Sequence, residues 1–232
     1  KNLAIVAVGK YTENFITSID IIEKFTNTFD TVYVLTDNVD KLQNYTTNTK
    51  LTYIFTHYSK DKFNYFNNGA HKADLFRYYY LYINGGVFID SDAIFEKHIN
   101  FIIKDYDFVS VKSIVPNTLF NGFIATTKKN PIIYNALRLL YTTSNEQLKK
   151  NYHLVCNQFL NVYNKYKQKN SILLYEYHDR RLDNIGVKTY DNWNTHVITH
   201  FSWCKKIPKN SNYKSKFCCD NWIFEFFKQN IC

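Results

Sequence analysis

The chain of 232 residues is 45% apolar and 21% charged, which is ordinary for a soluble globular domain. It contains no run of about 18 apolar residues, so we expect no transmembrane segment. The formal charge of +9 favours anionic partners such as a phosphorylated donor, a nucleic acid or an anionic membrane face, unless it only reflects lysine-rich coding on a solvated surface. No RNP, zinc-finger or helix-turn-helix signature supports a nucleic-acid partner.

Further features of composition bear on source and compartment. Asn, Lys, Tyr, Phe and Ile are abundant while Gly (6) and Pro (3) are scarce, which we interpret as AT-rich coding of the kind found in some giant viruses, parasites and bacteria. The chain begins at Lys1 and contains no Met, so we expect a fragment or a processed product, either cytoplasmic or cut from an anchored lumenal protein. Its five cysteines form no Cys-x-x-Cys pair, so we expect no structural zinc site. Four of them lie in the last 29 residues, where one disulfide is the alternative, but the chain length and the lack of a secretory signal favour reduced thiols.

No linker or repeat divides the chain, so we predict a single domain over residues 1–232. Its first half has the pattern of alternating strands and helices. The apolar run Leu3–Val8 ends at Gly9, a pattern typical of a strand buried on both faces of a sheet. Apolar side chains at helical spacing predict a helix over residues 12–25. Strands are predicted at Thr31–Leu35 and Leu51–Phe55, and this order favours an α/β fold with a mixed, mostly parallel sheet flanked by helices.

The second half continues the pattern. A helix is predicted from Gly69 to Asn84, stopped by Gly85-Gly86, where the first glycine can take a left-handed cap conformation. Later strands are predicted at residues 87–89, 108–111, 120–126, 172–175 and 197–198, and later helices at residues 131–141 and 146–166.

Polar residues follow three of these strands. Gly9, Thr36-Asp37 and Asp90-Ser91-Asp92 each lie at the carboxyl end of a predicted strand. In open α/β sheets ligands bind beyond these ends, so the sequence predicts one site there.

Asp90 and Asp92 are the most informative pair. Two carboxylates two residues apart, after a buried strand, indicate a hard cation such as Mn²⁺ or Mg²⁺ held by oxygen ligands. Such a cation would neutralise a diphosphate as it leaves. The alternative is two acids in an ordinary turn.

The wider segment carries a resemblance. It runs from His71 through Asp74, Arg77-Tyr78 and Gly85-Gly86 to Asp90-Ser91-Asp92. This segment closely resembles the DXD sugar-binding region of glycosyltransferase family 32, and more loosely the glucosylating bacterial toxins. The resemblance implies the GT-A fold and a metal-dependent glycosyltransferase with a nucleotide-sugar donor.

The same resemblance implies roles for the acidic and basic residues. Asp74 would bind sugar hydroxyls, Arg77 would contact the sugar or its phosphate, Asp90 would face the ribose and sugar, and Asp92 would be the direct metal ligand. Asp74 and Arg77 are three residues apart on a helix and therefore share one face. The alternative for them is a surface ion pair of little energetic value.

Two earlier strand ends resemble the uridine site of the blood-group-type glycosyltransferases. The residues concerned are Val6 and Val8 in the first strand, Tyr11 after it, and Thr36 and Asp37 after the second strand. The resemblance implies that the backbone there holds the base and that Tyr11 stacks on it. The alternative for Tyr11 is an exposed tyrosine in a chain that has 20 of them.

Three later features complete the expected site. Asn121, in Asn121-Gly122, resembles the next block of the family and would meet the donor sugar or the acceptor, unless it is a turn residue. His200, just before Trp203, resembles the late metal-binding histidine of related transferases and is preferred over His196 as a third ligand. Lys205 and Lys206 would close over the diphosphate.

The sequence thus predicts transfer of a hexose from a nucleoside-diphosphate sugar, UDP in preference to GDP, to the hydroxyl of a glycan, protein or lipid acceptor. The family resemblance implies a retaining reaction. No acid is found between Tyr152 and Leu160, where blood-group-type enzymes carry a candidate nucleophile, so for such a reaction we expect front-face attack assisted by the leaving diphosphate. One alternative is a haloacid-dehalogenase-like phosphatase, because a strand that ends in Asp-x-Asp also opens the domain of those enzymes. The other is a non-catalytic polyanion-binding protein.

Overall fold

The computed structural model describes residues 2–7, 29–36, 51–55, 60–90, 93–95, 97, 99–178, 187–191 and 195–200. The predicted helix over residues 12–25 lies outside this part. So do several residues proposed above for the site, namely Val8, Tyr11, Asp37, Asp92, Lys205 and Lys206.

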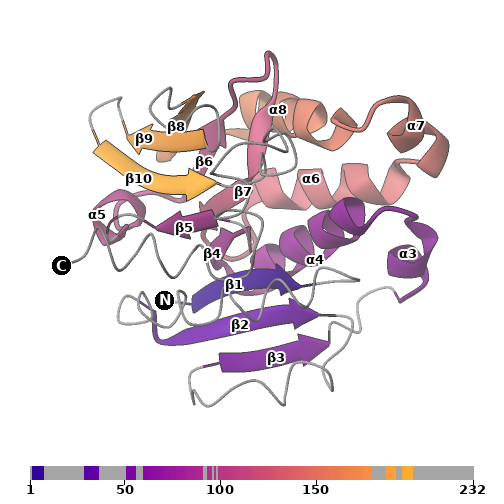
Figure 1. Cartoon of the computed structure of the whole chain (residues 1–232), viewed down its shortest axis with the longest axis horizontal. Coiled ribbons are helices and arrows are strands. Elements are labelled where there is room, and N and C mark those ends of the chain that lie inside the picture. The colour runs from indigo at the N-terminus through magenta and orange to yellow at the C-terminus, as the bar shows by residue number, and fades with distance from the viewer. Residues whose placement is uncertain are drawn as a thin grey trace, which may run out of the picture.

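The described strands form one sheet, which runs across Figure 1. In spatial order they are β3 (Leu51–Phe55), β2 (Thr31–Thr36), β1 (Asn2–Ala7), β4 (Gly86–Ile89), β7 (Leu119–Thr126), β6 (Phe108–Lys112), β8 (Ser171–His178), β9 (Val187–Asp191), β10 (Thr195–His200) and β5 (Ala93–Phe95). Neighbours from β3 to β4 are parallel, as are β6 and β8, and the other described pairs are antiparallel. The predicted mixed sheet flanked by helices is therefore confirmed.

Three long helices cover one face of the sheet (Figure 1). They are α4 (Gly69–Asn84), α6 (Pro131–Thr142) and α8 (Leu154–Tyr166), and α6 packs against both of the others. The shorter helices α3 (Lys60–Tyr65), α5 (Asn100–Ile103) and α7 (Asn145–Lys150) were not predicted as separate elements. In the part of the chain that the structure describes, no helix is long and apolar enough to cross a membrane.

Apolar cores lie on both faces of the central strands, which explains why these strands read as continuous apolar runs. In β1, Ala4 and Val6 join the core beneath the three long helices, while Leu3 and Ile5 join the core on the opposite face. The same alternation places Phe88 of β4 on the helical side. Side chains two residues apart in a strand share a face, so the next residue on that side is Asp90.

β5 and β10 cover the core that lies on the face of the sheet opposite the three long helices. Phe95 of β5 packs edge-on against Phe123 of β7, with ring centroids 6.2 Å apart, and Ile198 of β10 belongs to the same cluster. β5 is the last strand in the spatial order, but it begins at Ala93, only four residues after Ile89 of β4. The chain therefore brings β5 back beside β4. Figure 1 shows β5 between β10 and β4.

The predicted glycine stop after α4 is confirmed in its essentials. Gly85 has φ 64° and its N–H donates to the carbonyl of Leu81 at 2.8 Å. Gly86 has φ 104°, and a Cβ there would lie 2.7 Å from the backbone oxygen of Asn2. Both positions need glycine because of their positive φ, and the second also lets β4 approach β1 closely.

The single long helix predicted over residues 146–166 is wrong. α7 ends at Lys150 and α8 begins at Leu154. Between them the side chain of Asn151 accepts a hydrogen bond from the N–H of His153 at 3.1 Å. This local bond competes with helical pairing, which is a common reason for asparagine to interrupt a helix.

The strand directions define the edge of the sheet where the site lies. β7 is antiparallel to both β4 and β6, so the carboxyl ends of β1, β2, β4, β6 and β8 share one edge with the amino end of β7. β9 reverses the direction and β10 reverses it again, so β10 also ends at this edge.

Candidate active site

α4 directs Asp74 and Arg77 towards the sheet. Their exposed fractions are 6% and 4%, and Arg77 Nη2 lies 3.3 Å from Asp74 Oδ1. The predicted shared helix face is confirmed, but the alternative of a surface ion pair is wrong because both side chains are buried. A buried pair loses its hydration, so it is stable only when further hydrogen bonds satisfy both groups.

β4 supplies two of those further contacts to Arg77. The guanidinium lies over the Phe88 ring, 4.3 Å from its centroid. Arg77 Nη2 is also 3.5 Å from Oδ1 of Asp90, whose side chain is 27% exposed. Arg77 thus joins a carboxylate on a helix to one at the end of a strand.

β7 completes the network through Asn121. The backbone carbonyl of Asn121 accepts a hydrogen bond from Arg77 Nη1, and its Nδ2 donates to Asp74 Oδ1 at 3.2 Å. Asn121 is a buried strand residue, so the alternative of a turn asparagine is wrong. The register between β6 and β7 shifts between Val109 and Val111, beside this residue, and such irregularities commonly re-aim a side chain next to a site.

Gly122 gives the Asp90 carboxylate its space. Its carbonyl accepts a hydrogen bond from the N–H of Asp90 at 2.8 Å. A Cβ on Gly122 would lie 2.6 Å from Asp90 Oδ2 and 2.0 Å from the Phe120 ring. Neither Gly122 nor Phe88 was predicted from the sequence as a site residue, although the Asn121-Gly122 pair was a signal that could have indicated the glycine.

The charges of this network are coupled. Burial raises the pKa of the Asp74 carboxyl above its usual value, and the nearby Arg77 and His71 and the hydrogen bond from Asn121 oppose that rise. Burial alone would lower the pKa of Arg77, but the carboxylates of Asp90 and Asp74 raise it, so Arg77 stays charged. When both carboxylates are ionised, they and the guanidinium together carry a formal charge of −1, which suits a cation or hydroxyl donors.

The two strand ends predicted to bind the nucleoside lie next to each other. β1 pairs with β2 in parallel so that Ala7 lies opposite Thr36, and both Val6 and Thr36 are buried. Val8, Tyr11 and Asp37 lie outside the described residues, so the structure gives them no position.

The backbone register places His200 near the Asp-x-Asp segment. His200 of β10 pairs with Ala93 of β5, which directly follows Asp92. His196 pairs with Tyr190 of β9, at the opposite end of β10. The two histidines therefore lie at opposite edges of the sheet, and the predicted ligand is the one at the edge with Asp90.

No cluster of three or more His, Cys, Asp or Glu side chains that could hold a metal occurs among the residues that the structure describes. Only Asp90 of the three predicted ligands has a described side chain. Asp90 directly precedes Ser91-Asp92, and its partly exposed carboxylate at the carboxyl edge offers oxygen atoms of the kind that hard divalent cations prefer.

α8 brings a neutral thiol towards the same network. Cys156 is a free cysteine, and burial, followed by the charges of Asp74 and Asp90, raises its pKa to about 12. The thiol is therefore protonated at neutral pH and is no nucleophile.

Glu176 of β8 is a buried acid near the site that was not predicted from the sequence. Its Oε2 accepts hydrogen bonds from Ser113 Oγ at 2.6 Å and from the N–H of Ile114 at 3.0 Å. It thereby anchors the turn between β6 and β7 at the edge of the site.

Comparisons with known proteins bear on the fold and on the class of protein. A family model described as the glycosyltransferase sugar-binding region containing the DXD motif matches residues 13–109. The solved structure of the PaToxG glycosyltransferase is similar, with 19% identity and a TM-score of 0.52 over 71% of this chain and 68% of that chain. The galactosyltransferase LgtC, solved with donor and acceptor sugar analogues, has 9% identity and a TM-score of 0.50 over 75% of this chain and 73% of that chain. No curated protein sequence matches the chain.

The chain has the GT-A fold. The matched sugar-binding region, which includes Asp74, Arg77 and both acids of the Asp-x-Asp segment, supports a glycosyltransferase of the GT-A type. A transferase of this type implies a nucleotide-sugar donor and an acceptor.

Proposed function

We propose that this GT-A protein is a metal-dependent, retaining hexosyltransferase that uses a UDP-sugar, with a GDP-sugar as the alternative donor. The observation that carries the proposal is the buried network in which Arg77 joins Asp74 of α4 to Asp90 at the end of β4. It lies at the carboxyl edge, where ligands of α/β sheets bind. The sequence resemblance to glycosyltransferase family 32 over the same residues supports it.

In this proposal, Asp74 and Asp90 hold the sugar. Oδ1 of Asp74 is used by Arg77 and Asn121, so a sugar hydroxyl would donate to Oδ2. Asp90 is more exposed than Asp74 and would face the ribose and the sugar. The buried guanidinium of Arg77 fixes both carboxylates, because holding a substrate in one geometry requires groups that do not themselves reorient.

The nucleoside would lie over the ends of β1 and β2. Val6 pairs there with Leu35, the residue before Thr36, and the Val6, Val8 and Tyr11 segment resembles the base-binding strand of blood-group-type enzymes. This resemblance is the reason for preferring UDP. Thr36 and Asp37 would contribute to the same subsite.

Asp92, Asp90 and His200 would hold the divalent cation. When bound, the cation would neutralise the negative charge of the diphosphate. The pairing of His200 with Ala93 supports the choice of this histidine.

The acceptor hydroxyl would attack the anomeric carbon from the face on which the diphosphate leaves. The bond between that carbon and the phosphate oxygen breaks, the new glycosidic bond forms, and the hydroxyl proton passes to the leaving diphosphate. The absence of acidic residues from α8 and the protonated thiol of Cys156 support a reaction without a covalent enzyme intermediate.

The test is release of nucleotide from a panel of UDP- and GDP-sugars, with and without Mn²⁺. We expect turnover that depends on the metal, and we expect Asp92→Asn to abolish it without changing the circular dichroism spectrum, since one carboxylate charge is lost from the metal site. A phosphatase would release phosphate from simple phosphoesters instead, and a polyanion-binding protein would release nothing. Wild-type activity in Asp92→Asn would refute the proposed metal site.

A further inference from the structure

Tyr78 directly follows Arg77 in α4, and its hydroxyl contacts a residue of the site. Its side chain is fully buried, and its ring packs against Phe159 of α8 with centroids 5.3 Å apart. Its hydroxyl donates a hydrogen bond to Asn121 Oδ1 at 3.0 Å. Burial raises the pKa of Tyr78 well above its usual value, so the hydroxyl keeps the proton that it donates.

Asn121 stands between Tyr78 and Asp74. One end of its amide accepts from Tyr78, and the other end donates to Asp74 Oδ1 at 3.2 Å. A rotation of the amide by half a turn would set its oxygen against the carboxylate, and two acceptors repel each other. The carboxylate therefore selects the observed orientation, the Tyr78 hydroxyl holds it by donating to Oδ1, and each bond makes the other stronger.

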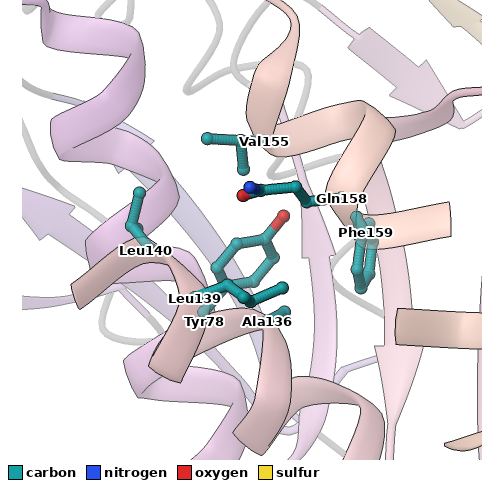
Figure 2. A pocket seen from close by; sticks show the side chains of 7 residues that line it. All are labelled: Tyr78, Ala136, Leu139, Leu140, Val155, Gln158 and Phe159. Atoms are coloured by element: carbon teal, nitrogen blue, oxygen red, sulfur yellow. The ribbon is translucent and has the colours of Figure 1, made fainter. Parts of the chain in front are cut away.

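The surroundings of Tyr78 allow this bond to be removed without repacking. Figure 2 shows the ring at the wall of a small cavity between α4, α6 and α8, with its hydroxyl on the side of Gln158. The cavity measures about 10 Å³ and is lined by Tyr78, Ala136, Leu139, Leu140, Val155, Gln158 and Phe159. Because most of this lining is apolar, a phenylalanine ring can occupy the same place.

We infer that Tyr78 is a positioning residue for the proposed transfer, acting through the amide of Asn121 on the carboxylate of Asp74. The inference rests on the proposed function. Tyr78 itself touches neither donor nor acceptor, so its contribution is to hold Asp74 in the orientation that meets the sugar.

The first test is Tyr78→Phe, which deletes only the hydroxyl. We expect kcat for donor turnover to fall roughly tenfold, with KM for the donor changed far less, since the carboxylate remains but is less well held. The matched control is Tyr80→Phe on the same helix, where the buried ring packs 5.6 Å from Tyr33 instead of facing Asn121. Equal kcat values for the wild type and Tyr78→Phe would overturn the inference.

A double-variant cycle tests the route through Asn121. If Tyr78 acts only through that amide, the variant carrying Tyr78→Phe and Asn121→Ala turns over at the rate of Asn121→Ala alone. Losses that multiply in the double variant would mean that Tyr78 acts by another route, and would overturn the inference.

A second readout does not need activity. In protein labelled with ¹⁵N-asparagine, and with the Asn121 signal assigned by its loss in Asn121→Ala, we expect hydrogen exchange of that side-chain amide to accelerate in Tyr78→Phe but not in Tyr80→Phe. An unchanged exchange rate of the Asn121 side-chain amide in Tyr78→Phe would overturn the inference. If the wild type turned over no nucleotide sugar, the proposed function would fail by itself, and this measurement would still decide whether Tyr78 orients Asn121.

Discussion

Arg77 shows how much a single side chain organises at this site. It contacts Asp74, Asp90 and the carbonyl of Asn121, and it stacks on Phe88, while only 4% of its surface is exposed. The sequence resemblance implies contact between this arginine and the donor. The structure shows that its Nη1 and Nη2 atoms are already engaged by protein groups, so we expect its main effect to be holding the two carboxylates.

Gly122 provides a prediction at the same scale. Gly122→Ala should lower donor turnover by on the order of a hundredfold, because the new methyl group would occupy the space of the Asp90 carboxylate and the Phe120 ring. The change is measured as kcat/KM together with the melting temperature. Gly69→Ala is the control, since a Cβ there meets nothing within 4 Å, and it should leave turnover unchanged. Full activity in Gly122→Ala would show that Asp90 tolerates displacement.

At the scale of elements, the path of the last strands matters most. β10 runs between β9 and β5, and β5 returns beside β4 because it begins four residues after Ile89. This return brings the end of β10 to the Asp-x-Asp segment, although more than one hundred residues separate the two in the chain. His196, at the other end of β10, lies at the edge of the sheet away from Asp90.

The two histidines of β10 therefore make a matched pair. His200→Ala should weaken Mn²⁺ binding in the presence of UDP, and should remove the loss of affinity that we expect as pH falls through about 6.5, where an imidazole ligand becomes protonated. His196→Ala should do neither. Calorimetric titration of Mn²⁺ at two pH values measures both effects. Unchanged affinity in His200→Ala at both pH values would remove it from the proposed ligands.

At the scale of the whole molecule, the proposed donor site draws on both halves of the chain. The ends of β1, β2 and β4 come from the first half, β7 supplies Asn121, and β10 comes near the carboxyl end of the chain. A ligand that contacts all of them binds only the folded protein. Its binding free energy is therefore added to the free energy of unfolding.

The corresponding prediction concerns thermal stability. At about 100 times Kd, UDP with Mn²⁺ should add about 2.7 kcal/mol, which raises the melting temperature of a protein of this size by roughly 5–10 °C. UDP or Mn²⁺ alone should give a smaller rise, and EDTA should reverse the effect of the pair. Differential scanning calorimetry measures these shifts. Equal stabilisation by UDP with and without Mn²⁺ would contradict a site in which the cation bridges protein and diphosphate.

Much of the fold could be predicted from local patterns. The limits of α4 and β3 were predicted residue by residue, because helical spacing, the glycine stop and short apolar runs are properties of adjacent residues. The break between α7 and α8 was missed, because a single asparagine side chain interrupts an otherwise helical pattern. β9, whose residues alternate without a strong apolar signal, was also missed.

The sequence by itself determined which residue types are available: the helix bearing Asp74 and Arg77, the glycine pair that ends it, and the acidic segment that follows β4. These depend on neighbours along the chain. Only the tertiary structure decided that Arg77 is buried between two carboxylates, that Asn121 and Gly122 meet them from β7, and that His200 rather than His196 ends near Ala93. The reason is that most of those contacts join residues from 13 to more than 100 positions apart, and they arise from strand direction, a register shift and the return of β5, which no local pattern encodes.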